Sequence, residues 1–176
     1  MQSLKCDKRI EVLAECYANK CIAIELLQAI SKSIRCSAKI RHSYKQGRDR
    51  IVQEVVKPLR ECVRIAVIDY EKGASRIFID KNFSLEKVWS GVFIGVSKRS
   101  TNSIAIVFDP NIEEALLCRI DEEICRDIYL YQKVKSRDAC SVMSRILDSS
   151  EFNEFLNKVA SRVIDILKHL TSDEAQ

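Results

Sequence analysis

The sequence predicts an α/β fold, in which a mostly parallel central sheet carries helices on both faces and further helices follow at the C-terminal end. Short apolar runs alternate with stretches of helical period over residues 10–120. The run "VRIAVID" (63–69) is apolar at nearly every position, as in a strand that is buried on both faces of a parallel sheet. A regular succession of strands and helices favours right-handed crossovers, which make the strands parallel.

Length and composition agree with a single domain over residues 1–176. The chain has 176 residues and an apolar fraction of 47%, which is enough for one real core. A formal charge of +4, from 29 basic and 25 acidic residues, neither indicates nor opposes nucleic-acid binding. No signal peptide is visible and no apolar run reaches membrane-spanning length. We therefore expect a soluble, cytoplasmic protein that makes no membrane contact.

The expected elements can be placed along the chain. Strands are expected at 10–16, 37–43, 63–69 and 103–110, with a further strand in "GVFIGVS" before the last of these. The first helix has Asn19 as its predicted N-cap. A second helix, over 50–62, is expected to kink or break at Pro58. Residues 74–89 are predicted to form a loop and a short helix.

From residue 121 onward the pattern is helical, as in a C-terminal extension of a core at 10–120. A nearly heptad apolar stripe runs along the last segment, formed by Phe152, Leu156, Val159, Val163, Ile166 and Leu170. This stripe has two interpretations: it closes the core of its own chain, or it forms the seam of a homodimer.

Eight cysteines are many for a chain of this length, and their spacing fits no zinc pattern. They are interpreted either as buried apolar filler or as disulfides of the kind that hyperthermophiles form in the cytoplasm. Cys16 and Cys21 are the first pair to test.

Polar side chains follow the predicted strands at the edge where α/β sheets build their sites. They are Glu15, His42, Asp69 with Glu71, and Asp109 with Glu113 and Glu114 just beyond. Alternation along a strand predicts that Asp69 and Glu71 point to the same side. Two such carboxylates, with a third from a neighbouring strand, make the oxygen site that Mg²⁺ takes when it also binds phosphate.

These features, in this order, resemble the TOPRIM domain, a Rossmann-like fold of topoisomerases and primases that OLD-type nucleases share. The likeness is to divergent stand-alone members and covers roughly residues 10–120. The motifs that carry it are "LAECY", "RHSYKQGRDR", "AVIDYEKG" and "IAIVFDPNIEEALL".

The resemblance implies a role for each matched acid. Glu15 would be the general acid or base, and Asp69 and Glu71 would be ligands of Mg²⁺ or Mn²⁺, with Glu113 or Glu114 completing the set. The sequence departs from the family pattern at two positions. Cys16 stands where Gly commonly follows the first Glu, and Glu71 replaces the second Asp. Cys16 removes the backbone freedom that Gly would give a close phosphate contact.

The densest basic stretch follows the second predicted strand. It combines Gly47 with four cations before a helix whose amino end favours anions; these cations are Arg41, Lys45, Arg48 and Arg50. One interpretation is phosphate binding, with His42 as a proton shuttle near neutral pH. The other is a solvated turn in which Asp49 caps the helix.

Two functions remain open from the sequence. One is a divalent-metal-dependent nuclease or nucleic-acid-binding protein of TOPRIM-like fold. The other is a non-catalytic interaction or regulatory module of the same fold, which a dimer through the C-terminal helix would suit. P-loop, Rossmann dinucleotide and serine esterase chemistry all lack their required glycine motifs.

Overall fold

The computed structural model describes residues 4–5, 9–42, 47–57, 59 and 61–172. A six-stranded sheet has the order β4-β2-β5-β8-β7-β6. The first four strands of this order are parallel, and β7 lies antiparallel to both β8 and β6. The strands are β2 (Arg9–Ala14), β4 (Ala38–His42), β5 (Cys62–Asp69), β6 (Phe83–Trp89), β7 (Val92–Ser97) and β8 (Ser103–Phe108). A separate short pair joins β1 (Leu4–Lys5) to β3 (Ile34–Arg35) in parallel.

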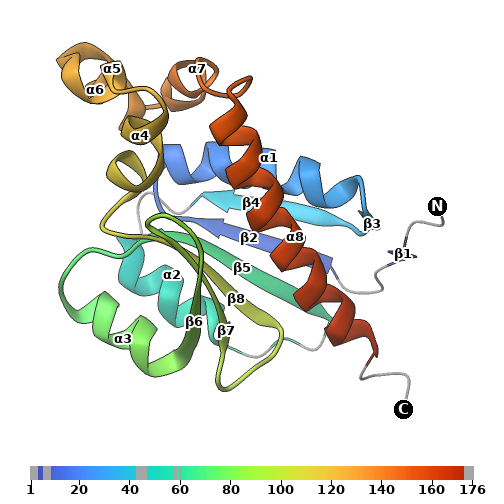
Figure 1. Ribbon diagram of the computed structural model, residues 1–176. Coiled ribbons are helices and arrows are strands. Elements are labelled where there is room, and N and C mark those ends of the chain that lie inside the picture. The colour runs from blue at the N-terminus through green and yellow to red at the C-terminus, as the bar shows by residue number, and fades with distance from the viewer. Residues whose placement is uncertain (1–3, 6–8, 43–46, 58, 60, 173–176) are drawn as a thin grey trace.

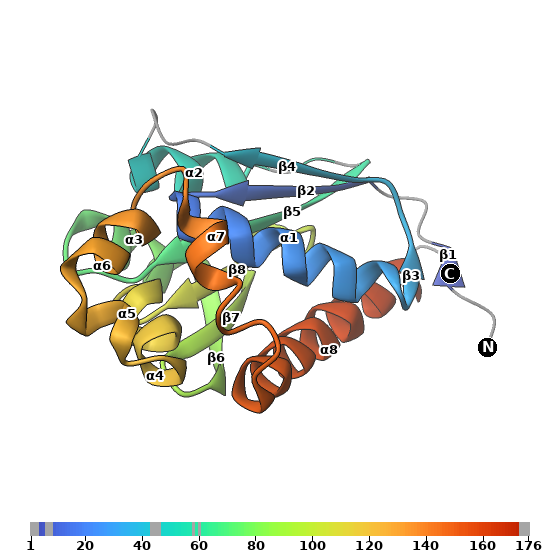
Figure 2. The ribbon, with the colours of Figure 1, turned by 90° about the horizontal axis from the view of Figure 1, so that it is seen from above.

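Helices cover both faces of the sheet, which confirms the predicted α/β class (Figures 1 and 2). On one face, α1 (Tyr17–Ser31) and α8 (Ser150–Ser172) share a core with the sheet. On the other face, α2 (Gly47–Val55) and α3 (Ala74–Asn82) form a second, smaller core with it.

The central position of β5 is also confirmed. It lies between β2 and β8, and five consecutive residues from Ile65 to Asp69 are buried. Every residue of β8 is buried as well. Residues 65–68 of β5 and 104–108 of β8 are all apolar, because helices cover both faces of these strands.

Residues 74–89 differ from the prediction of a loop and a short helix. They form α3 and then the edge strand β6, which pairs antiparallel with β7. The burial of β6 is uneven and several of its side chains are exposed, so the sequence pattern there is weak. The partner strand approaches closely: a Cβ at Gly95 would lie 2.7 Å from Leu85 Cδ2 and 3.0 Å from Phe83 Cβ.

The start of α1 and the end of α2 differ from the predicted positions. The N-cap of α1 is Cys16, so the prediction of Asn19 is wrong; the Asn19 backbone N–H donates to Cys16 Sγ at 3.4 Å. The strand ends at Ala14, and the helix begins as soon as the chain has turned. α2 ends at Val55, before Pro58, which lies outside the described residues.

The C-terminal helices belong to the fold. Short helical segments follow β8 and gather on the side toward which the parallel strands point (Figure 2). They are the π-helix η1 (Glu113–Leu117), α4 (Cys118–Ile120), α5 (Glu123–Arg126), α6 (Ile128–Val134) and α7 (Ala139–Met143).

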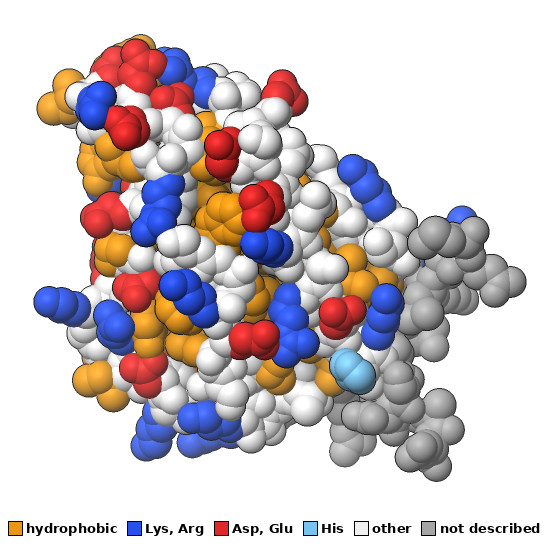
Figure 3. Space-filling view, viewed as in Figure 1, with side chains coloured by type: hydrophobic (Ala, Val, Ile, Leu, Met, Phe, Trp, Pro, Cys, Tyr) orange, Lys and Arg blue, Asp and Glu red, His pale blue; other side chains and the backbone are white. Residues whose placement is uncertain are grey.

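The apolar stripe of α8 packs in the core of its own chain, as the first of its two interpretations expects. Phe152, Val159 and Val163 are fully or almost fully buried in the core that α8 shares with α1. The outer surface of α8 is polar: acidic and basic side chains lie interspersed over this face (Figure 3). Among the described residues, no helix is long and apolar enough to cross a membrane.

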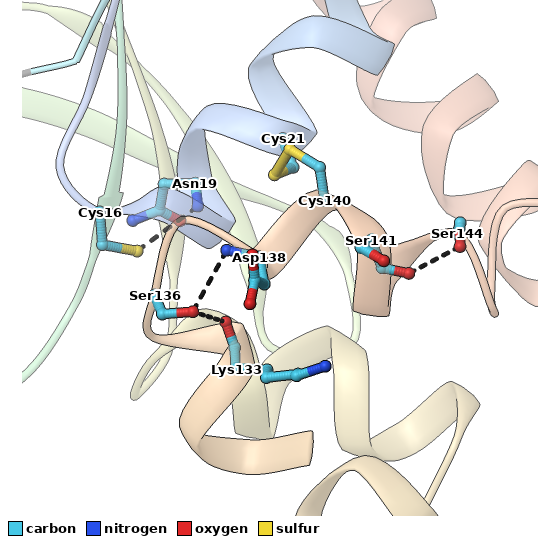
Figure 4. The surroundings of a disulfide bond; sticks show 9 residues. All are labelled: Cys16, Asn19, Cys21, Lys133, Ser136, Asp138, Cys140, Ser141 and Ser144. Atoms are coloured by element: carbon cyan, nitrogen blue, oxygen red, sulfur yellow. Dashed lines mark hydrogen bonds between the residues drawn. A yellow bond between two sulfur atoms is a disulfide. The ribbon is translucent and has the colours of Figure 1, made fainter. Parts of the chain in front are cut away.

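Among the cysteines that the structure describes, two disulfides form, and neither joins the pair that was expected first. Cys21 of α1 bonds to Cys140 of α7 (Figure 4), and Cys118 bonds to Cys125. Cys16 is a free thiol, so the Cys16–Cys21 prediction is wrong. Five residues span about 1.4 helical turns, which separates the two side chains around α1.

Candidate functional site

The carboxyl ends of the four parallel strands bring polar residues from distant parts of the sequence to one edge. In the register of the sheet, Ala14 lies opposite both His42 and Val67. Glu15 therefore follows β2 beside the end of β5, where its backbone N–H donates to the Val67 carbonyl at 3.2 Å. Glu113 enters from η1, after β8.

Asp69 is the centre of this arrangement and is only 8% exposed. Its Oδ1 accepts the backbone N–H of Ile112 at 3.0 Å and the side-chain amide N–H of Asn19 at 3.4 Å. Its own backbone N–H donates to Glu15 Oε2 at 3.0 Å. The end of β5 is thereby joined directly to the residues that follow β2 and β8.

The electrostatics indicate crowded, poorly solvated carboxylates. Burial, followed by the charges of Glu15 and Glu113, raises the pKa of Asp69 to about 8, against the lowering effect of the Ile112 N–H and Asn19. Burial also raises the pKa of Glu15, while the Asp69 N–H and Arg48 oppose the rise. Both groups would ionise more readily beside a cation, which is the behaviour expected of a functional cluster.

Glu113 and Glu114 have different surroundings. Glu113 is only 6% exposed, and its charge raises the pKa of both Asp69 and Cys16. Glu114 instead donates its backbone N–H to Asn111 Oδ1, and its Oε1 accepts from Asn111 Nδ2. The inner acid of this pair is therefore Glu113.

Glu71 does not share a ligand position with Asp69. β5 ends at Asp69, so the alternation of a strand no longer fixes the direction of Glu71. Its carboxylate is half exposed and forms an ion pair with Arg48 at 3.1 Å. Glu71 still lies near enough to contribute to the raised pKa of Glu15.

The described cations of the basic stretch do not share one environment. Arg48 lies close to Glu15 and Glu71, whereas Arg41 forms ion pairs with Glu11 and Glu54 on β2 and α2. Arg50 lines a groove along α2 that also contains Arg41, Asp49, Gln53, Glu54, Lys57 and Arg64. Lys45 lies outside the described residues.

His42 lies one strand away from the carboxylates. Its ring meets the ring of Tyr17 edge-on, with centroids 4.6 Å apart. Burial, and then the charge of Lys20, lowers the pKa of His42.

The surroundings of three residues at the site were not predicted from the sequence. Asn19 is fully buried, and its Oδ1 has no hydrogen-bond partner among the described residues. Lys135 follows α6 and is exposed; a hydrogen bond with Tyr131 raises its pKa, and the charges of Glu113 and Glu71 add to the rise. Cys16 has its pKa raised to about 12, first by burial and then by Asp69, so it is a neutral thiol and no nucleophile. Only Asn19 carried a signal, as a polar residue at the start of an apolar helix.

The side chains near Asp69 include oxygen atoms of the type that hard cations bind, but they are not arranged as a metal site. The carboxylates of Asp69, Glu15 and Glu113 are oxygen donors of the type that Mg²⁺ and Mn²⁺ prefer. The Asn19 Oδ1 is a buried oxygen that has no hydrogen-bond partner within the described part of the chain. Among the described residues, no group of three or more Asp, Glu, His or Cys side chains is arranged to hold a metal ion.

Comparisons with protein-family models, with curated proteins and with solved structures found no match to this chain. The TOPRIM likeness therefore rests on the short motifs of the sequence.

Proposed function

We propose that the protein binds Mg²⁺ or Mn²⁺ through Glu15, Asp69 and Glu113 and acts on phosphodiester bonds of nucleic acid, in the manner of a TOPRIM-like nuclease. The observation that carries this proposal is the burial of Asp69 between two other acids, with a pKa raised to about 8. Buried like charges destabilise one another unless a proton or a cation compensates them.

When bound, such a cation neutralises phosphate charge and lowers the pKa of an attacking water. Residues of the chain supply the proton transfer and the contact with phosphate. Burial brings the pKa of Glu15 closer to neutrality, which suits a general acid or base. Arg48, next to Glu15, has a guanidinium whose geometry matches phosphate oxygens. Its present partner Glu71 is half exposed, so a phosphate can replace that partner at little cost.

The test is Mn²⁺ binding by isothermal titration calorimetry, together with Mg²⁺- or Mn²⁺-dependent cleavage of single- and double-stranded DNA and RNA. Asp69→Asn should weaken Mn²⁺ binding by about tenfold or more and abolish cleavage, because a central charged ligand is lost. Glu114→Gln is the matched control, since it removes an acid next to Glu113 that faces its own helical turn. Absence of Mn²⁺ binding by the wild-type protein would contradict the proposal.

A non-catalytic module of the same fold is the second candidate. Two observations favour it: the Glu71 carboxylate is taken by Arg48, and Cys16 holds the position where a flexible glycine would admit phosphate. Mn²⁺ binding that depends on Asp69 but gives no cleavage of any substrate would support this second candidate.

A further inference from the structure

A cavity lies between α1, the end of β4 and the segment that leads into α7. Its volume is about 340 Å³, within the range of small-ligand sites, and it is lined by Tyr17, Lys20, Cys21, His42, Arg137 and Cys140. His42 lies opposite Ala14 in the sheet register, so this side of the cavity lies at the edge of the sheet where Glu15 follows β2.

The absence of acidic side chains from its described lining distinguishes this cavity from two other grooves of the protein. Its described lining contains Lys20 and Arg137 and no Asp or Glu. The groove along α2 includes Asp49 and Glu54, and the groove at the amino ends of the strands includes Glu11 among its lining residues. Lys20 lowers the pKa of His42, so its ammonium lies within electrostatic reach of the ring. An anion in the cavity would meet cations from two separate elements.

The wall that carries Arg137 is covalently held. Cys140, three residues after Arg137, bonds to Cys21 of α1, and both half-cystines line the cavity (Figure 4). The disulfide joins positions 119 residues apart in the sequence, so it fixes α7 against the start of α1. The shape of the cavity therefore depends on this bond.

We infer that this cavity binds a phosphate group, with Lys20 and Arg137 as its charged contacts, and that the Cys21–Cys140 disulfide keeps the two contacts together. Guanidinium and ammonium groups are the side chains best suited to phosphate oxygens. The phosphate is either inorganic or the terminal phosphate of a nucleic-acid strand that leads toward Glu15. In the second case the inference extends the proposed function.

Binding is measured by isothermal titration calorimetry in EDTA, so that no divalent metal takes part. The probes are inorganic phosphate and a short oligonucleotide with either a 5′-phosphate or a 5′-hydroxyl. Lys20→Gln and Arg137→Gln should each weaken phosphate binding by about tenfold, the loss of one charged hydrogen bond. Lys32→Gln removes the same charge from an exposed position at the other end of α1 and should leave binding unchanged. Stronger binding of the 5′-phosphate than of the 5′-hydroxyl identifies a strand end as the ligand, and binding of inorganic phosphate alone identifies the free anion.

His42 supplies a second readout. Bound phosphate would favour the charged imidazole, so the pKa of His42 measured by NMR should rise on addition of phosphate. Lys20 and Arg137 are the charged groups that line the cavity beside it among the described residues.

Cys140→Ser tests the part played by the disulfide, and reduction of the wild-type protein is the alternative if that variant fails to fold. Loss of the disulfide by substitution or by reduction should weaken phosphate binding at least as much as Arg137→Gln. Equal phosphate affinity with and without the disulfide would refute the claim that this bond keeps the two charged contacts together. Absence of phosphate binding by the wild type, or binding that survives both charge substitutions, would overturn the inference as a whole. Neither result bears on Mn²⁺ binding at Asp69, which is measured separately.

Discussion

Asp69→Asn should make the protein more stable at alkaline pH, although it removes the residue at the centre of the candidate site. The substitution keeps a side-chain oxygen to accept the N–H groups of Ile112 and Asn19. It removes the charge that burial, Glu15 and Glu113 disfavour.

The size of this effect on stability follows from the pKa of Asp69. A rise from 3.8 to about 8 corresponds, at about 1.4 kcal/mol per pH unit, to a cost of about 6 kcal/mol for the fully ionised group. The folded protein binds this proton more tightly than the unfolded chain. The contribution of Asp69 to stability is therefore complete below pH 3.8 and is lost as the pH rises to about 8. Asn does not titrate, so the variant avoids this loss.

Urea unfolding at pH 5, 7 and 9 in EDTA measures the effect. The free energy of unfolding of Asp69→Asn, relative to wild type, should increase by about 2 to 4 kcal/mol between pH 5 and pH 9, the lower figure allowing for water that enters the site. In a separate unfolding series at pH 7 without EDTA, Mn²⁺ at about 100 times its dissociation constant should stabilise the wild type by about 2.7 kcal/mol and the variant far less. Glu114→Gln should follow the wild type throughout. A constant difference between Asp69→Asn and wild type across this pH range would refute the electrostatic reasoning.

Three further predictions concern the rest of the molecule. Arg48→Gln should raise the pKa of Glu15, because it removes a cation that lowers that pKa; NMR titration of the carboxyl carbons would show this, and an unchanged pKa would place Arg48 elsewhere. Phe155→Ala should lower the free energy of unfolding by about 3 to 5 kcal/mol in urea, because the ring is fully buried between other aromatic rings; a loss below about 1 kcal/mol would contradict that packing. Cys140→Ser should cost about 5 kcal/mol and Cys118→Ser about 2, since the first bond closes 119 residues and the second only 7; equal losses in thermal unfolding would count against this entropic account.

The parts of the fold that could be predicted are those in which local pattern and tertiary packing agree. β5 and β8 are buried on both faces, so their sequences are mostly apolar. The predicted spans, 63–69 and 103–110, agree with the observed Cys62–Asp69 and Ser103–Phe108 to within two residues at each end. The edge strand β6 was missed because most of its side chains are only half-buried or exposed, and because its hydrogen bonds come from β7, a partner that its own sequence does not specify.

In the candidate site, too, one contact could be predicted from the sequence and another could not. Strand ends predicted that Glu15 and Asp69 meet, because parallel strands bring their carboxyl ends to one edge. The pairing of Glu71 with Arg48 could not be predicted, because it depends on β5 ending at Asp69 and on the placement of α2.

The sequence by itself determined the class of fold, the central strand and the edge at which the acids gather, since these follow from hydrophobic period and chain direction. Only the tertiary structure decided that Asp69 is enclosed by Glu15 and Glu113, that Cys21 pairs with Cys140, and that Lys20 and Arg137 line one cavity. The physical reason is that burial, charge interaction and disulfide bonding depend on distances in space. Such distances between residues far apart in the chain are set by how the helices pack on the sheet.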